Sequence, residues 1–185
     1  MNVLGISGSL RRDSHNTKLL RAAAAMLPPG AELDVWEGLK AVPPYDADDD
    51  QRNEPRPEPL RSLAAAIERA DVVLFATPEY NHSIPGQLKN ALDWLSRPLA
   101  SSPLRNKPVA VVGASSGLFG AVWAQAELRK VLGAIGARVI DRELPVGLAD
   151  DAFTAEGRLA DEDLELVLAD VLAELVDEVR PAVLA

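Results

Sequence analysis

Residues 5–17 read Gly-Ile-Ser-Gly-Ser-Leu-Arg-Arg-Asp-Ser-His-Asn-Thr, and the apolar run Val3–Ile6 leads into them. Apolar residues then recur at helical spacing from Leu19 to Leu27, so the stretch joins a strand to the N-terminus of a helix. The first N–H groups of a helix are unpaired and lie at the positive end of its dipole, which favours an anion. The polar side chains that would add donors or charge are Ser9, Arg11, Ser14, Asn16 and Thr17. The stretch predicts a phosphate-binding loop; the alternative is an ordinary loop with a Ser or Asn cap.

This loop is not one of the common nucleotide-binding motifs. It has no G-x-G-x-x-G, which argues against a dinucleotide site of Rossmann type, and no G-K-[ST], which excludes a P-loop. A phosphate bound here would belong to another kind of ligand.

Composition narrows the class of protein. The length of 185 residues predicts one domain, residues 1–185, and the 48% of hydrophobic residues can supply its core. A net charge of −9 argues against nucleic acid and anionic membranes as partners. There is no Cys for disulfides or thiol catalysis, and the two His residues lack the spacing of a metal motif. No apolar run approaches the roughly 18 residues of a membrane span, so we expect a cytoplasmic protein without a bound metal.

Strand and helix patterns alternate along the chain. The expected strands are residues 2–7, 32–36, 71–76, 107–113 and 137–140. The expected helices are residues 16–27, 60–70, 86–95, a segment that ends near 135, and 161–179. Parallel strands need right-handed crossovers, which place helices on both faces of the sheet. The pattern predicts a three-layer, doubly wound α/β domain with a five-stranded parallel sheet.

Three polar loops follow the first, third and fourth expected strands. In doubly wound sheets, ligands bind beyond the carboxyl ends of the strands, so the three loops should meet at one edge. The second loop, residues 78–83, offers an aromatic ring, an amide and stiffening prolines, and the third, residues 115–120, offers hydroxyls and glycines. Together the three loops suit a planar, phosphorylated ligand.

Two further segments predict an interface. Residues 40–59 carry five prolines and an acidic run, and form either a surface loop or a loop that orders against a partner subunit, with Tyr45 as its large apolar side chain. In the helix 86–95, Leu88, Leu92, Leu95 and Trp94 are more apolar than one sheet face requires. We expect this helix to form part of a homodimer interface.

The three loop motifs carry a resemblance. Gly-Ser-Leu-Arg-Arg-Asp-Ser-His-Asn-Thr, then Thr-Pro-Glu-Tyr-Asn-His-Ser-Ile-Pro-Gly-Gln-Leu-Lys-Asn-Ala-Leu-Asp-Trp, then Gly-Ala-Ser-Ser-Gly-Leu-Phe-Gly resemble the NAD(P)H-dependent FMN reductase family, which includes flavodoxin-like quinone and chromate reductases. The likeness spans about residues 2–140. It implies FMN as cofactor, NADPH or NADH as co-substrate, strand order 2-1-3-4-5, and a homodimer or homotetramer with the flavin near a subunit interface.

The resemblance also implies which residues bind FMN. Those for the phosphate are Ser9, Arg11, Ser14, Asn16 and Thr17. Those that line the isoalloxazine ring are Pro78, Glu79, Tyr80, Asn81, His82 and Ser83, and those that close its other side are Ser115, Ser116 and Gly117. The chain departs from many relatives in the third loop, where Leu118 and Phe119 replace glycine-rich sequence, so the substrate remains open.

The implied reaction is a ping-pong transfer of hydride from NAD(P)H, through FMN, to a quinone, free flavin or similar small acceptor. No catalytic side chain is needed, because the flavin carries the chemistry. The alternative is a flavodoxin-like electron carrier or a flavin-binding module without NAD(P)H turnover. His15 and His82 are either proton donors or loop hydrogen bonders. Glu79 is expected to accept bonds from N–H groups at a helix N-terminus. The acceptor, the choice between NADH and NADPH, and the number of subunits stay open.

Overall fold

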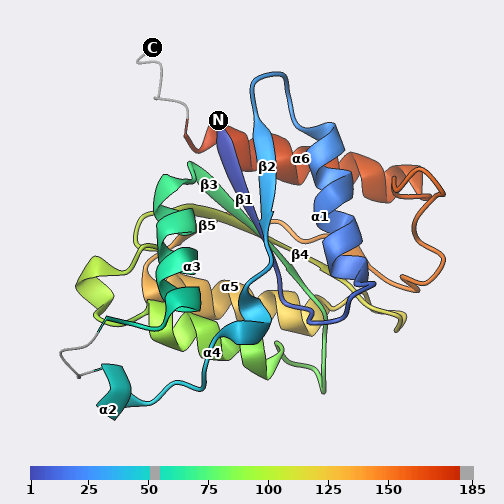
Figure 1. The fold of residues 1–185 in the computed structure, drawn as a ribbon. Helices are drawn as coiled ribbons and strands as arrows, with labels where there is room; N and C mark the ends of the chain where they lie inside the picture. The colour runs from blue at the N-terminus through green and yellow to red at the C-terminus, as the bar shows by residue number, and fades with distance from the viewer. Residues whose placement is uncertain (51–54, 180–185) are drawn as a thin grey trace.

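A parallel sheet forms the middle of three layers in the computed structural model, which describes residues 1–50 and 55–179 (Figure 1). The strands are β1 (Asn2–Ser7), β2 (Glu32–Trp36), β3 (Val72–Thr77), β4 (Pro108–Ala114), β5 (Arg138–Val139) and β6 (Pro145–Val146). The helices are α1 (His15–Met26), α2 (Ala47–Asp50), α3 (Glu58–Arg69), α4 (Gly86–Leu95), α5 (Val122–Ile135) and α6 (Glu162–Asp177), with 3-10 turns η1 (Leu39–Ala41) and η2 (Leu99–Ser101).

The strand order is β2-β1-β3-β4-β5, and every pairing is parallel. This confirms the doubly wound α/β fold and the order 2-1-3-4-5. The fifth position differs from prediction, because β5 pairs with the start of β4 and β6 pairs with its end. The polar residues between β5 and β6 do not pair with β4, and one of them, Arg142, forms an ion pair with Glu174 of α6. β5 and β6 have two residues each, which is too short for a hydrophobic pattern to predict either strand.

Alternate side chains of the inner strands face the two helical layers. In β3, Val73 and Phe75 pack in the core cluster of α3, α4 and α5, whereas Val72 and Leu74 pack in the cluster of α1 and α6. All residues of β3 and β4 are buried, as expected of central parallel strands covered on both faces. This rigid sheet positions the loops at its carboxyl edge.

The apolar stripe of α4 packs inside the single chain, so it gives no reason to place a dimer interface on this helix; the dimer itself stays a prediction. Leu88, Leu92, Trp94 and Leu95 are each at most 3% exposed within the single chain. The segment after β2 covers the helix from its outer side, and the indole Nε1 of Trp94 donates to the Pro43 carbonyl at 3.0 Å. The apolar stripe is wider than contact with the sheet alone requires, because α4 also packs against the segment that follows β2.

The first half of the proline-rich segment is ordered by these contacts with α4. Tyr45 packs edge-on against Trp94 with ring centroids 5.0 Å apart, and its N–H donates to Asn90 Oδ1 at 2.7 Å. Gln87 Nε2 donates to the carbonyls of Leu39 and Val42. Residues 39–46 therefore order against their own domain, whereas part of the predicted loop, residues 51–54, lies outside the described residues.

Candidate functional site

The three loops meet at one edge of the sheet, as predicted. Ser7 pairs in register with Ala76, and Thr77 with Gly113, so β1, β3 and β4 end level with one another. The Gly8 N–H donates to the Ala76 carbonyl at 2.8 Å. A Cβ atom at Gly8 would lie 3.0 Å from Leu88 and 3.3 Å from Pro78, so glycine lets the first loop approach the second closely.

Ser14 and Asn16 hold the first turn of α1 in place. Ser14 is the N-cap, and its Oγ accepts from the Thr17 N–H at 3.2 Å. Asn16 is buried, its Nδ2 donates to the Ala114 carbonyl at 2.9 Å, and its Oδ1 accepts from the Ala114 N–H at 3.0 Å. Asn16 thus ties the first loop to the end of β4. One N–H of its amide and the Ser14 O–H remain as donors for a phosphate.

A pocket of about 280 Å³ lies between the first loop and the end of β2. We call it the basic pocket, because its lining includes Arg11, Arg12, Arg21 and Lys40, beside Ser9 and Thr17. Asp13, the acidic residue within the loop, is engaged elsewhere: Lys18 donates to it at 2.9 Å, which lowers the pKa of the Asp13 carboxyl. The Arg11 guanidinium forms no hydrogen bond or ion pair within the described residues, so it is available to a phosphate.

Residues 80–83 form a tight turn. The Tyr80 N–H donates to the Ser83 carbonyl, and the Ser83 N–H to the Tyr80 carbonyl, each at 3.1 Å. The two central residues, Asn81 (φ 53°) and His82 (φ 59°), are left-handed, as in a type I′ turn. Non-glycine residues in this region cost free energy and are concentrated at binding sites. The turn presents Tyr80, Asn81 and His82 to solvent at the sheet edge.

Glu79 binds a helix N-terminus, as predicted. Its Oε2 accepts from the N–H groups of Trp123 and Ala124 in the first turn of α5, each at 3.1 Å. The opposite carboxylate oxygen lies 3.6 Å from His82 Nδ1. His82 in turn packs edge-on against Trp123, with ring centroids 4.5 Å apart. The Glu79 side chain therefore connects the second loop to α5, which leaves its backbone for a ligand.

Two residues of α5 that the sequence did not single out position the loops. Glu127 Oε2 accepts from the Ser83 hydroxyl at 2.5 Å and from the Ile84 N–H at 3.3 Å. Gln125, fully buried, donates to the Gly120 carbonyl at 3.0 Å and accepts from the Leu144 N–H at 3.1 Å. The sequence did contain a signal for Gln125, because it is a glutamine on the apolar face of a helix. A buried polar side chain needs hydrogen-bond partners, so such a residue is a candidate for positioning a loop.

We predict that Glu127→Ala weakens FMN and riboflavin equally, by about tenfold. The change leaves the Ser83 hydroxyl and the Ile84 N–H without their acceptor, and a hydrogen bond to a charged group contributes roughly 1.5–3 kcal/mol. Fluorescence titration of both flavins measures the effect. Ser83→Ala with and without Glu127→Ala completes a double-mutant cycle, in which coupling is expected. A loss of affinity for FMN but not for riboflavin would contradict this role, because it would point to the phosphate, which Glu127 is not proposed to contact.

The third loop packs on residues 145–149. The Ser115 N–H donates to the Val146 carbonyl and the Ala149 N–H to the Ser115 carbonyl. Gly120 has φ 58°, and a Cβ there would lie 2.3 Å from the carbonyl carbon of Pro145. The Gly117 N–H donates to Ser115 Oγ at 3.1 Å. These contacts shape the loop and leave the side chains of Ser116, Leu118 and Phe119 exposed.

An apolar cavity of about 360 Å³ lies between the first and second loops. Its lining includes Leu10, Arg11, Tyr80, Pro85 and Gly86. The volume falls within the roughly 300–1,000 Å³ of small-molecule sites. Arg11 also lines the basic pocket. An apolar space for a flat ring thus adjoins a cationic space for a phosphate, and this arrangement fits FMN.

His15 forms a loop hydrogen bond, which was one of the two roles predicted for it. Its Nε2 lies 2.9 Å from Asp150 Oδ1, and its ring is parallel to that of Phe153 at 6.3 Å. It connects the start of α1 to the segment before α6. Asp150 lies far from His15 in sequence, so no local pattern could predict this contact.

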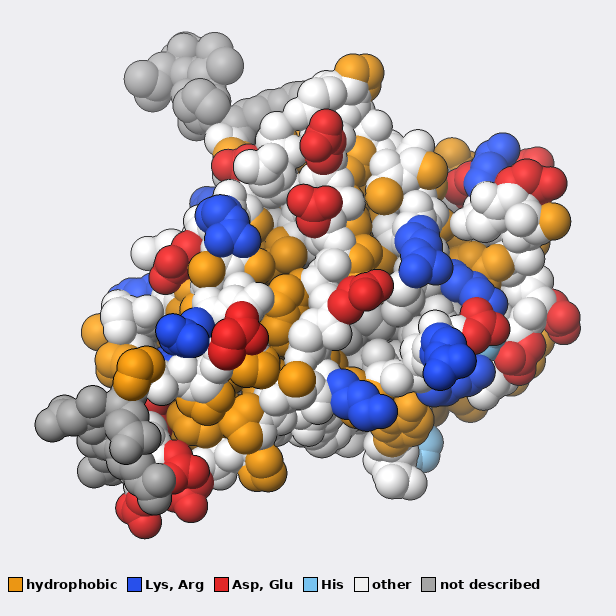
Figure 2. Space-filling view, viewed as in Figure 1, with side chains coloured by type: hydrophobic (Ala, Val, Ile, Leu, Met, Phe, Trp, Pro, Cys, Tyr) orange, Lys and Arg blue, Asp and Glu red, His pale blue; other side chains and the backbone are white. Residues whose placement is uncertain are grey.

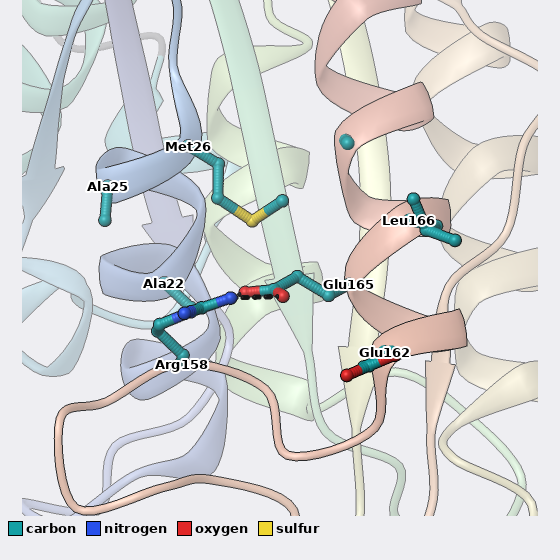
Figure 3. Close-up of a pocket in the computed structure, with 8 residues that line it drawn as sticks. Ala22, Ala25, Met26, Arg158, Glu162, Glu165 and Leu166 are labelled. Atoms are coloured by element: carbon teal, nitrogen blue, oxygen red, sulfur yellow. Dashed lines mark hydrogen bonds and ion pairs between the residues drawn. The ribbon is translucent and has the colours of Figure 1, made fainter.

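A further cavity, of about 690 Å³, lies between α1 and α6 (Figure 3). Arg158 donates two hydrogen bonds to Glu165 across it, at 2.9 and 2.7 Å, which lowers the pKa of the Glu165 carboxyl. Its other lining residues are mainly alanines and Met26 (Figure 3). None of its lining residues belongs to the three loops, so the cavity is separate from the candidate site.

Residues 1–151 match the family model of NADPH-dependent FMN reductases. The chain belongs to this family. An NAD(P)H-dependent FMN reductase of Pseudomonas aeruginosa is 40% identical over 163 residues, 88% of this chain and 86% of the relative. A 2-hydroxy-1,4-benzoquinone reductase of Burkholderia sp. is 37% identical over 164 residues, 88% of this chain and 87% of the relative. The solved flavoenzyme NAD(P)H:(acceptor) oxidoreductase of Paracoccus denitrificans is 34% identical with a TM-score of 0.82, and the match covers 96% of both chains.

This FMN reductase is therefore an oxidoreductase that uses FMN as cofactor and NAD(P)H as electron donor. None of its described helices is long and apolar enough to cross a membrane.

Proposed function

We propose that this FMN reductase passes hydride from NAD(P)H, through FMN, to a small quinone or free flavin. One observation carries the proposal: the apolar cavity and the basic pocket lie side by side and share Arg11. The names of two relatives support the acceptor class, since one is a benzoquinone reductase and another an FMN reductase. The Vibrio ruber relative, an NADH:(hydroxy)cinnamate reductase subunit, is 39% identical over 180 residues, 95% of this chain and 86% of the relative.

Each predicted site residue has a role in this proposal. The phosphate would be held by Ser9, Arg11 and Thr17 in the basic pocket, with the Ser14 O–H and the free N–H of Asn16 beside them. The ring would lie against the second loop, residues 78–83, with Ser115, Ser116 and Gly117 on its other side. Bound FMN supplies the centre that accepts and releases hydride. The chain's own residues bind and orient it, and the exposed edge at Tyr80 admits donor and acceptor in turn.

Steady-state kinetics tests the reaction. FMN-loaded protein should oxidise NADPH or NADH with a benzoquinone acceptor, and initial rates should give the parallel double-reciprocal lines of a ping-pong reaction. Protein that binds FMN but oxidises neither nucleotide would favour the alternative, an electron carrier or flavin-binding module. Protein that takes up no FMN would overturn both functions.

We also propose a homodimer or homotetramer that works in the cytoplasm, where NAD(P)H is available. Because the apolar stripe of α4 is buried within its own chain, the candidate interface moves to the exposed apolar residues beside the site, Leu118, Phe119 and Trp123. The rings of Phe119 and Trp123 contact each other at 5.1 Å. Exposed apolar clusters of this kind mark association surfaces. Sedimentation equilibrium of wild type and Phe119→Ser measures the state of association.

A further inference from the structure

The proposed reduction of a quinone needs one more proton than the hydride supplies. A quinone becomes a hydroquinone by gaining two electrons and two protons, whereas hydride carries both electrons and a single proton. A side chain positioned to donate the second proton accelerates such a step. Histidine changes its charge near neutral pH and is the commonest residue for this task. The chain has two histidines, His15 and His82.

His82 is open to a small acceptor, whereas His15 is not. The His15 side chain is 10% exposed, and its Nε2 lies 2.9 Å from Asp150 Oδ1. The His82 side chain is 74% exposed, on the turn that joins β3 to α4 at the carboxyl edge of the sheet. This turn belongs to the second loop, against which the flavin ring is proposed to bind. His82 is therefore the histidine placed beside the reacting groups.

The charges around His82 are opposite to those of the basic pocket. Figure 2 shows Lys and Arg side chains gathered around a recess beside α1 on this face of the molecule. The charged side chains that contact the turn of His82 are carboxylates: Glu79 of the same loop, and Glu127 of α5, which binds the neighbouring Ser83. A carboxylate beside an imidazole orients the ring and stabilises the charge that it carries when protonated.

Glu79 and Trp123 hold two sides of the His82 ring. The Glu79 side chain is 12% exposed, and its Oε2 is fixed by the N–H groups of Trp123 and Ala124. Its Oε1 lies 3.6 Å from His82 Nδ1, and the ring packs edge-on against Trp123. The opposite nitrogen, Nε2, forms no hydrogen bond or ion pair with another described residue. The ring is thus anchored at Nδ1 and leaves Nε2 for a ligand.

His82 occupies a backbone position that favours glycine. It is the second central residue of the turn, with φ 59°, where type I′ turns prefer glycine. A histidine in this conformation costs free energy, and such strain is concentrated at functional sites. The conformation points to a use for the imidazole.

We propose that His82 is the general acid that protonates the acceptor, and that Glu79 is the positioning residue that orients its ring. This role rests on the proposed function and names a catalytic residue for it. As hydride reaches the quinone, the N–H bond at His82 Nε2 breaks, its electron pair stays on the nitrogen, and an O–H bond forms at a quinone oxygen. The neutral ring then takes a proton from solvent, so one hydride and one proton yield one hydroquinone.

The oxidative half-reaction tests His82. FMN-loaded protein is reduced with NADPH or NADH and mixed rapidly with benzoquinone or with ferricyanide, which takes electrons singly and without a proton. The ratio of the benzoquinone rate to the ferricyanide rate isolates the proton-dependent step. His82→Gln should lower this ratio about 100-fold, the lower end of the range for a general acid, because water partly replaces an exposed donor. His15→Gln, the matched control, should keep the ratio within about twofold of wild type.

Chemical rescue separates proton donation from a merely structural role. His82→Gly should fold with a melting temperature at or above that of wild type, because glycine adopts positive φ freely. Added imidazole should raise the benzoquinone rate of His82→Gly and have no effect on its ferricyanide rate.

Nuclear magnetic resonance tests the contacts without turnover. In oxidised FMN-loaded protein, the product hydroquinone should shift the ring signals of His82 and leave those of His15 in place, with His82→Gln assigning them. At alkaline pH, where both rings are neutral, nitrogen shifts should place the His82 proton on Nδ1 in wild type. In Glu79→Gln it should move to Nε2, because an amide whose oxygen binds α5 presents its N–H groups to the ring. The same variant should lower the rate ratio about tenfold.

The contrary results are distinct from a failure of the proposed function. An unchanged rate ratio in His82→Gln, no rescue of His82→Gly by imidazole, or His82 signals that hydroquinone leaves in place would each overturn the proposal. A His82 proton that stays on Nδ1 in Glu79→Gln would overturn the part given to Glu79. In all these cases the protein would still oxidise NAD(P)H, whereas failure of the proposed function would appear as FMN-loaded wild type that oxidises neither nucleotide.

Discussion

Replacing Arg11 with alanine should weaken FMN binding about 10- to 150-fold and leave riboflavin binding almost unchanged. A hydrogen bond between ionised partners contributes roughly 1.5–3 kcal/mol, and Arg11 belongs to the loop that leads into the N-terminus of α1, where the dipole also favours an anion. Arg11 is exposed, so solvent screening places the result toward the lower end of that range. Titration of apo protein with each flavin measures both affinities.

Two comparisons make this prediction specific to the phosphate. Tyr80→Ala should weaken FMN and riboflavin alike, because the tyrosine lines the apolar cavity and not the basic pocket. Raising the salt concentration should lower the affinity for FMN more in wild type than in Arg11→Ala, because salt screens the interaction between the two charges. FMN affinity within about twofold of wild type in Arg11→Ala would remove this residue from the site and leave the phosphate to backbone N–H groups and hydroxyls.

Replacing Asn16 with alanine should lower the free energy of unfolding of the apo protein by about 2–6 kcal/mol. The change leaves the N–H and the carbonyl of Ala114 buried without their partners, and each such group costs roughly 1–3 kcal/mol. For a chain of this size the melting temperature should fall by about 2–4 °C for each kcal/mol. Urea denaturation and calorimetry of apo protein measure the loss.

Controls separate this structural role from phosphate binding. Asn16→Asp should be no better than alanine, because a carboxylate cannot donate to the Ala114 carbonyl. Asn2→Ala removes an exposed asparagine of β1 and should change stability by less than about 0.5 kcal/mol. If Asn16→Ala left apo stability intact and weakened only FMN, Asn16 would be a phosphate ligand and not the tie between α1 and β4.

Local patterns in the sequence were sufficient for the fold class. The apolar runs of β1, β3 and β4 and the helical spacing between them determine parallel strands covered on both faces, because each element's periodicity shows which side it buries. The helix bounds at α4 were predicted to the residue. The convergence of the three loops followed from topology alone, since carboxyl ends of parallel strands share one edge.

The sequence by itself also determined which loops carry the ligand chemistry, whereas only the tertiary structure decided what each side chain does. Asn16 was chosen as a ligand from its motif, yet its amide binds the backbone N–H and carbonyl of Ala114 in β4. Those partners are distant in sequence, and no local pattern encodes them. No local pattern predicted that Trp94 is buried and donates to the Pro43 carbonyl. Nor did one predict that Arg21 of α1 and Lys40 of η1 line the basic pocket. Periodicity reports what a segment buries, but the choice of partner depends on the packing of the whole chain.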